Sequence, residues 1–183
     1  QYGKEGVLSL LEQHPEIKFV SLVGIDLAGN DTDEKIPMAA FFDDYEAFFE
    51  GRAVQTDGSS VVLTNIATLN NARVDMWGDP SVNWFVDYNY ENIDEATGLP
   101  TGTLRIPAFL MHNYRYVDSR SILKRSCDYV RAELLSLIKE KGVPGMPHVK
   151  ADDVVDIVFT SATELEFWVK TPSKTVTKKE LSV

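Results

Sequence analysis

Three carboxylates and two hydroxyls stand in this chain at spacings that suit chemistry. The first group is Asp57-Gly-Ser-Ser60, in which a carboxylate, a glycine and two hydroxyls follow one another. A carboxylate beside hydroxyls on a tight loop can hold a cation such as ammonium and accept its proton. The same residue types are also ordinary turn formers, so the motif alone predicts either a cation site or a polar surface turn.

The second group is Glu164 and Glu166, within Thr163-Glu-Leu-Glu-Phe167. Apolar residues alternate with the two glutamates, which predicts a half-buried strand with both carboxylates on one face. Their Cα atoms would lie ~6.5–7 Å apart, so each could ligate one of two adjacent hard cations. A strand with a solvated acidic face is the alternative interpretation.

Other catalytic chemistries have little support in the sequence. His14, His112 and His148 are far apart and lack partners at zinc-ligand spacing. The glycine-rich phosphate-binding and dinucleotide-binding fingerprints are missing, and neither serine of the Asp-Gly-Ser-Ser group stands in a nucleophile elbow. Structural or surface roles are therefore expected for the histidines.

Composition and charge narrow the class of partner. The net charge of −10 repels phosphate backbones, so we expect no nucleic-acid partner, whereas cations are compatible. Acidic residues interrupt the apolar runs, so we expect no membrane partner, and no secretory signal is visible. The single cysteine, Cys127, fits a reducing compartment, which predicts a cytoplasmic protein.

The elements that must position these groups begin with an N-terminal helix, expected over residues 4–13 in a segment spanning 1–16. A hairpin is predicted from a strand over 17–25 and a second strand through Ile36. A helix over 37–50 then presents the aromatic stripe Phe41, Phe42, Tyr45, Phe48 and Phe49, which we interpret as core. Further strands are expected near 60–63, 84–88 and 103–112, giving an α+β domain over 17–112.

A long helix opens the second region, residues 113–183. Asp118 or Ser119 can cap its N-terminus, and Gly142 can end it. The region then continues through a Pro- and Gly-containing linker to the expected strand that carries Glu164 and Glu166.

Three segments in order resemble glutamine synthetases: Asp57-Gly-Ser-Ser60, Val117-Asp-Ser-Arg-Ser-Ile-Leu-Lys-Arg125 and Thr163-Glu-Leu-Glu-Phe167. The order and approximate spacing carry most of the specificity. The resemblance implies a β-grasp-like N-terminal domain, followed by a helix and the first strand or strands of an incomplete catalytic domain. It also implies that the chain is a fragment, inactive alone, of a longer cytoplasmic enzyme.

The activity that this resemblance implies is that of an ATP-dependent glutamate–ammonia ligase, which forms glutamine through γ-glutamyl phosphate. In the family, the aspartate matching Asp57 binds and deprotonates ammonium and the serine matching Ser60 supports it. Both act on the catalytic domain of a neighbouring subunit in a homo-oligomeric ring. Glu164 and Glu166 would help hold Mg²⁺ or Mn²⁺, with glutamate, ammonium and ATP as substrates.

Two alternatives stay open. Thr56 stands where the family usually has an aromatic residue, and the stretch from Ser60 to Asp75 is longer than usual, which leaves room for a related glutamate–amine ligase that uses a larger amine. Ala162 also stands where glycine is common. The other alternative is a non-catalytic structural or binding member of the same fold.

Overall fold

The structure, a computed structural model, describes residues 4–63, 69, 72–164 and 166. The chain divides into two compact units, Gln1–Ala132 and Glu133–Val183. In the part of the chain that is described, none of the helices combines the length and apolar character needed to cross a membrane.

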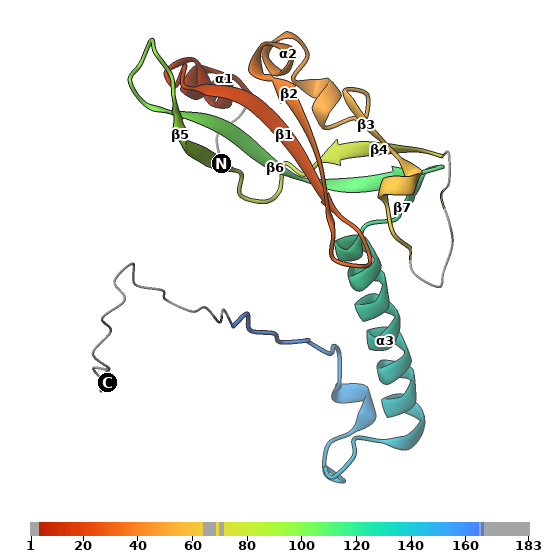
Figure 1. Cartoon of the computed structure of the whole chain (residues 1–183). Coiled ribbons are helices and arrows are strands. Elements are labelled where there is room, and N and C mark those ends of the chain that lie inside the picture. Colours follow the sequence, from red (N-terminus) through yellow and green to blue (C-terminus); the bar gives the residue numbers. More distant parts are fainter. Residues whose placement is uncertain (1–3, 64–68, 70–71, 165, 167–183) are drawn as a thin grey trace, which may run out of the picture. The chain divides into compact units, whose positions relative to one another are not determined.

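One mixed sheet forms the framework of the first unit (Figure 1). Its long central strand, β6, pairs in parallel with β1 and antiparallel with β4, β5 and β7. β2 and β3 add antiparallel to β1 and β4, so the main path runs β2-β1-β6-β4-β3. The strands are β1 Ile17–Ile25, β2 Asp31–Pro37, β3 Val54–Asp57, β4 Arg73–Gly78, β5 Phe85–Ile93, β6 Pro100–His112 and β7 Arg115–Tyr116.

Short helices cover one face of this sheet. α1 (Lys4–Glu12) contributes the buried Leu11 to the core, α2 (Met38–Asp43) contacts β1 and β2, and the 3₁₀ helix η1 (Glu46–Phe48) contacts β4. A sheet covered by helices on one face agrees with the predicted α+β class. The finer β-grasp assignment stays a prediction.

The core follows from period-two alternation along the strands. In β6, alternate residues from Leu104 to Leu110 are buried, whereas Arg105, Pro107 and Phe109 between them are partly exposed. The predicted aromatic stripe is confirmed as core: Phe41 is fully buried, with its ring centroid 5.0 Å from that of Phe48.

The helix predicted over 37–50 is not continuous. α2 ends at Asp43, Asp44 adopts φ −142° and ψ 74°, and η1 follows. The Asp44 carboxylate accepts a hydrogen bond of 3.2 Å from the backbone N–H of Ala47, so this side chain competes with the helical pattern. Periodicity located the aromatic side chains correctly, but it could not show this break.

The sequence analysis misplaced one strand and missed another. Residues 60–63 form no strand, and the strand next to the Asp-Gly-Ser-Ser motif is β3, which ends at Asp57. β4 was not predicted at all. Both are short and gain their backbone hydrogen bonds from distant segments, so local patterning identifies them poorly.

The long helix α3 (Ser119–Lys141) begins in the first unit and ends in the second. Asp118 caps it as predicted, accepting a hydrogen bond of 2.8 Å from the Ser121 N–H, and Gly142 follows its end with φ +81°. In the second unit, the 3₁₀ helix η3 (Ala151–Asp153) follows. Residues 154–164 and 166 have no regular secondary structure.

Candidate functional site

Asp57 ends β3 and caps the single 3₁₀ turn η2 (Gly58–Ser60). Its carboxylate accepts a hydrogen bond of 2.7 Å from the backbone N–H of Ser59. The side chain and backbone of Ser59 together hold the pKa of Asp57 below its ordinary value. Asp57 is exposed, so the turn presents an ionised carboxylate to solvent.

Gly58 is buried, and backbone atoms of another segment approach it closely. A Cβ atom at this position would lie 2.0 Å from the backbone oxygen of Leu69 and 2.9 Å from that of Ala72. The Gly58 N–H donates to the same Ala72 oxygen at 2.6 Å. Glycine is therefore needed because backbone approaches closely, and the turn is held firmly on this side.

Asp26, in the turn between β1 and β2, was missed by the sequence analysis. It is fully buried, and its two carboxylate oxygens accept hydrogen bonds from the backbone N–H groups of Ala28, Asn30 and Val62, each at 2.9 Å. The Asn30 side-chain amide adds a bond of 3.1 Å. Burial by itself raises the pKa of Asp26, but these hydrogen bonds outweigh it and the net pKa is lowered.

These bonds tie the β1–β2 hairpin to the segment that carries the motif. Val62 lies just beyond η2, and its carbonyl accepts from the Leu27 N–H at 3.2 Å. The hydroxyl of Thr32, on β2, donates to the backbone oxygen of Ser60 at 3.3 Å. The turn is thus fixed from both sides, by Ala72, the residue before β4, and by the hairpin through Asp26, while Ser60 itself remains exposed.

Adjacent strands bring further polar groups to the same edge of the sheet. Asp57 stands opposite Arg73 in the β3–β4 register, and the Arg73 guanidinium pairs with Asp75 at 2.7 Å. The backbone oxygen of Arg73 lies 3.0 Å from Nδ1 of His112, at the end of β6. Arg73 and His112, both more than fifteen positions from Asp57 in the sequence, therefore lie near Asp57 at the same edge of the sheet.

The second motif that carried the resemblance, around Arg120, has a structural explanation. Arg120 forms an ion pair with the buried Asp79, and its guanidinium carbon lies 4.8 Å from the centroid of the Phe109 ring. Burial raises the pKa of Asp79, but hydrogen bonds from Ser81 and the Arg120 charge lower it more. Arg120 thereby anchors the first turn of α3 to the sheet.

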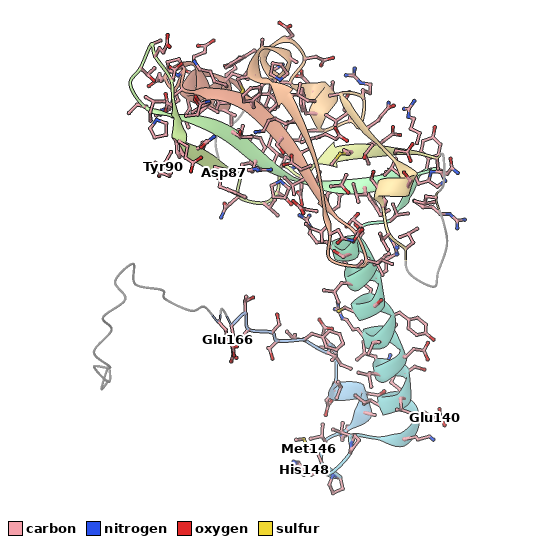
Figure 2. All side chains as sticks on the ribbon, viewed as in Figure 1. Asp87, Tyr90, Glu140, Met146, His148 and Glu166 are labelled. Atoms are coloured by element: carbon pink, nitrogen blue, oxygen red, sulfur yellow. The ribbon has the colours of Figure 1, made fainter. Side chains whose placement is uncertain are left out.

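Glu164 and Glu166 do not lie on a strand in the structure, so that expectation is wrong for these two residues. Both are exposed and neither lies in regular secondary structure, whereas Leu165 and Phe167 of the expected strand lie outside the described residues. Figure 2 labels the Glu166 side chain. An isolated alternating segment needs a neighbouring strand to supply its backbone hydrogen bonds, and local pattern cannot guarantee one. Among the described residues, no group of three His, Cys, Asp or Glu side chains could hold a metal ion. The role of Glu164 and Glu166 as metal ligands stays a prediction.

Comparisons with known proteins give a weak likeness to a solved structure. No family model matches the chain, and no curated protein matches it. A solved structure of glutamine synthetase from Plasmodium falciparum matches with a TM-score of 0.48 and 14% identity, over 73% of this chain and 23% of that chain. This chain spans less than a quarter of the length of that protein. The likeness indicates at most a related fold and carries no argument about function.

Proposed function

We propose that the chain is the N-terminal part of an ATP-dependent ligase that joins ammonia to the γ-carboxyl of glutamate through γ-glutamyl phosphate. The observation that carries this proposal is the Asp57 turn, which holds an ionised, exposed carboxylate between two backbone anchors. The Asp-Gly-Ser-Ser sequence and its order relative to the two later motifs support it.

Asp57 would act first by charge. Its lowered pKa keeps it ionised at neutral pH, which favours holding an ammonium ion. A carboxylate with a low pKa is a weak base, so proton transfer from ammonium becomes efficient only when the surrounding site is closed and dry. The Ser60 hydroxyl, three residues along on the same turn, would add an acceptor for the ammonium N–H groups.

Glu164 and Glu166 would contribute ligands for Mg²⁺ or Mn²⁺. Their exposed carboxylate oxygens suit hard cations in kind, but two side chains supply fewer than the roughly six ligands that Mg²⁺ takes, so further ligands must come from elsewhere. When bound, the metal ions would neutralise the charge on ATP during phosphoryl transfer. We further propose a cytoplasmic, ring-shaped homo-oligomer in which Asp57 serves the neighbouring subunit.

A ligase that uses a larger amine is the second candidate. Thr56 was the residue that suggested it, but the Thr56 side chain is 7% exposed and faces the interior beside Val54. Thr56 and Asp57 therefore project to opposite faces of β3, and Thr56 is badly placed to select an amine. This candidate now depends on the long stretch over 61–72, of which residues 64–68 and 70–71 lie outside the described structure.

Phosphate release by the full-length protein tests the proposal. Glutamate, ATP and Mg²⁺ are supplied with ammonium, ethylamine or putrescine in turn, and glutamine is measured alongside. We expect release that depends on glutamate and is fastest with ammonium. Faster release with either larger amine would favour the second candidate, and no release with any amine would favour a non-catalytic member of the fold.

Asp57→Asn separates the charge of Asp57 from its structural role. Asparagine caps a helical turn about as well as aspartate, so the turn should persist while the charge is lost. We expect a higher KM for ammonium and a lower kcat, with unchanged thermal unfolding. Asp43→Asn, an exposed aspartate at the end of α2, is the matched control and should retain parental kinetics.

A further inference from the structure

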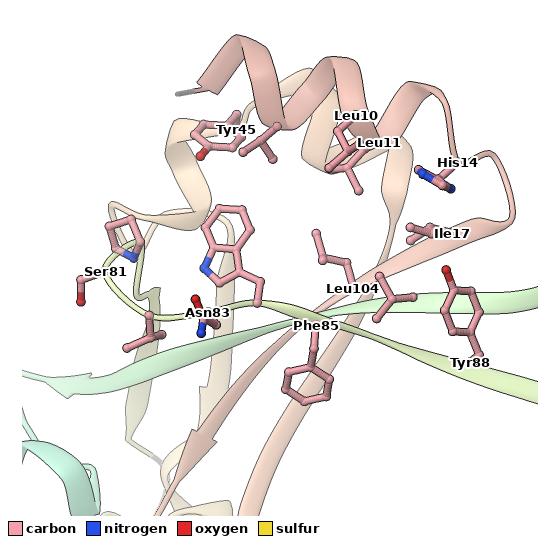
Figure 3. A pocket seen from close by; sticks show the side chains of 15 residues that line it. Leu10, Leu11, His14, Ile17, Tyr45, Ser81, Asn83, Phe85, Tyr88 and Leu104 are labelled. Carbon is pink, nitrogen blue, oxygen red and sulfur yellow. The ribbon is translucent and has the colours of Figure 1, made fainter. Parts of the chain in front are cut away.

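A cavity of about 1040 Å³ opens between α1 and the sheet, within the first unit (Figure 3). Buried core residues line it on both sides, Leu11 from α1 and Ile17 and Leu104 from the sheet. Leu10, 45% exposed, and Val82, 37% exposed, stand at its rim. The cavity is open to solvent, and apolar side chains make up most of its lining.

The charge of the lining is as informative as its apolar character. Among the described residues that line the cavity there is no Asp, Glu, Lys or Arg. His14 also lines the cavity, and its Nδ1 already lies 3.0 Å from the buried carboxylate of Glu16. A charged ligand would lose its hydration here without gaining an opposite charge.

Two phenols lie at opposite ends of the cavity in Figure 3, Tyr45 and Tyr88. Burial, followed by the nearby Glu46 carboxylate, raises the pKa of Tyr45, with Lys4 opposing. Burial, Glu16 and Tyr90 raise the pKa of Tyr88. Both hydroxyls therefore stay protonated at physiological pH and can donate hydrogen bonds, and Asn83 adds a side-chain amide.

We propose that this cavity is a binding site for a neutral, predominantly aromatic small molecule that carries hydrogen-bond acceptors. Its volume lies just above the ~300–1,000 Å³ of ordinary ligand pockets, and its lining combines apolar walls with a few polar groups. The indole of Trp84 supplies an aromatic wall whose Nε1 is already satisfied by the backbone oxygen of Asp79 at 3.0 Å. This site is distinct from the Asp57 turn, and the proposal does not depend on the ligase activity.

The test uses two dyes with the same aromatic skeleton. N-phenyl-naphthylamine is neutral, and anilinonaphthalene sulfonate adds one negative charge. Fluorescence titration of the protein should show saturable binding of the neutral dye at one site per chain and weaker binding of the sulfonate. Leu10→Arg, which places a charge at the rim of the cavity, should weaken neutral-dye binding by about tenfold or more.

Leu99→Arg is the control. Leu99 is 48% exposed, a fraction similar to the 45% of Leu10, but it does not line the cavity. It should leave dye binding unchanged, and circular dichroism should show both variants folded. Equal dye binding by the two variants, or a sulfonate that binds as tightly as the neutral dye, would overturn the proposal. So would a change in oligomeric mass with Leu10→Arg alone, which would instead assign the cavity to a second copy of the chain.

Discussion

The buried carboxylate of Asp26 accepts a hydrogen bond of 2.9 Å from the backbone N–H of Val62, although the two residues are 36 positions apart. This bond joins the β1–β2 hairpin to the segment that follows Ser60. Any disturbance at Asp26 should therefore reach the turn on which Asp57 is presented.

Asp26→Asn should destabilise the protein and loosen that turn. The substitution keeps the size but replaces an oxygen that accepts N–H groups with an amide that donates, at a cost of about 1–3 kcal/mol. Urea unfolding measures the loss. Nuclear magnetic resonance should show the pKa of Asp57 returning toward its ordinary value, because the Ser59 hydrogen bonds that lower it would weaken. Asp31→Asn, at an exposed hairpin position, should change neither quantity.

Stability should fall in acid through Asp26 and Asp79. Both have a folded-state pKa below the ordinary value, so their contribution is fully present above the unfolded pKa of about 3.9 and is lost as pH falls through the folded pKa. Unfolding free energies measured from pH ~6 downward should decline below about pH 4. The decline should be shallower in Asp26→Asn and in Asp79→Asn; an unchanged pH profile in both variants would contradict the assignment.

Gly58→Ala should damage both folding and activity. The added methyl group would meet the backbone oxygens of Leu69 and Ala72, which are held in place by the hydrogen bonds from the Ala72 N–H and the Gly58 N–H, and we expect a loss of about 1–3 kcal/mol. In the full-length enzyme, turnover should fall because the Asp57 turn is displaced. Gly98→Ala faces open space and bears only the cost of its φ of +70°, so it should lower stability modestly and leave turnover unchanged.

Asp57 should act across a subunit boundary. Full-length subunits carrying Asp57→Ala, mixed with subunits disabled in the catalytic domain, should regain part of the activity when they assemble together. The measurement is glutamine formation by rings whose mixed composition has been verified by mass. Activity that never rises above the sum of the two inactive parents would exclude action in trans.

Glu164→Gln and Glu166→Gln should each lower metal-dependent turnover of the full-length enzyme by orders of magnitude, because the charge that offsets a divalent cation is lost. Both side chains are exposed, so folding should be nearly unaffected. Glu140→Gln, an exposed glutamate on α3, is the matched control. Parental turnover in both variants, at limiting Mg²⁺, would leave the solvated acidic segment as the correct interpretation.

The sequence by itself predicted the elements whose signals are local. α1 and the β1–β2 hairpin follow from apolar periodicity, and α3 follows from the same signal together with the Asp118 cap and Gly142. The aromatic residues from Phe41 to Phe49 were predicted to be core for the same reason. Two short helices direct these side chains into the core, as one continuous helix would. The Asp57 turn was also recognisable, because its residue types are those of a capped turn.

Only the tertiary structure decided what depends on segments distant in the chain. β3 and β4 are strands because each finds a partner, and Glu164 and Glu166 lie outside a strand although their alternation favours one. Gly58 is required by the carbonyl of Leu69, and Asp26 matters because Val62 lies against it. Residue spacing encodes periodicity along one element, whereas burial and hydrogen bonding between elements arise only when the chain folds and its elements pack together.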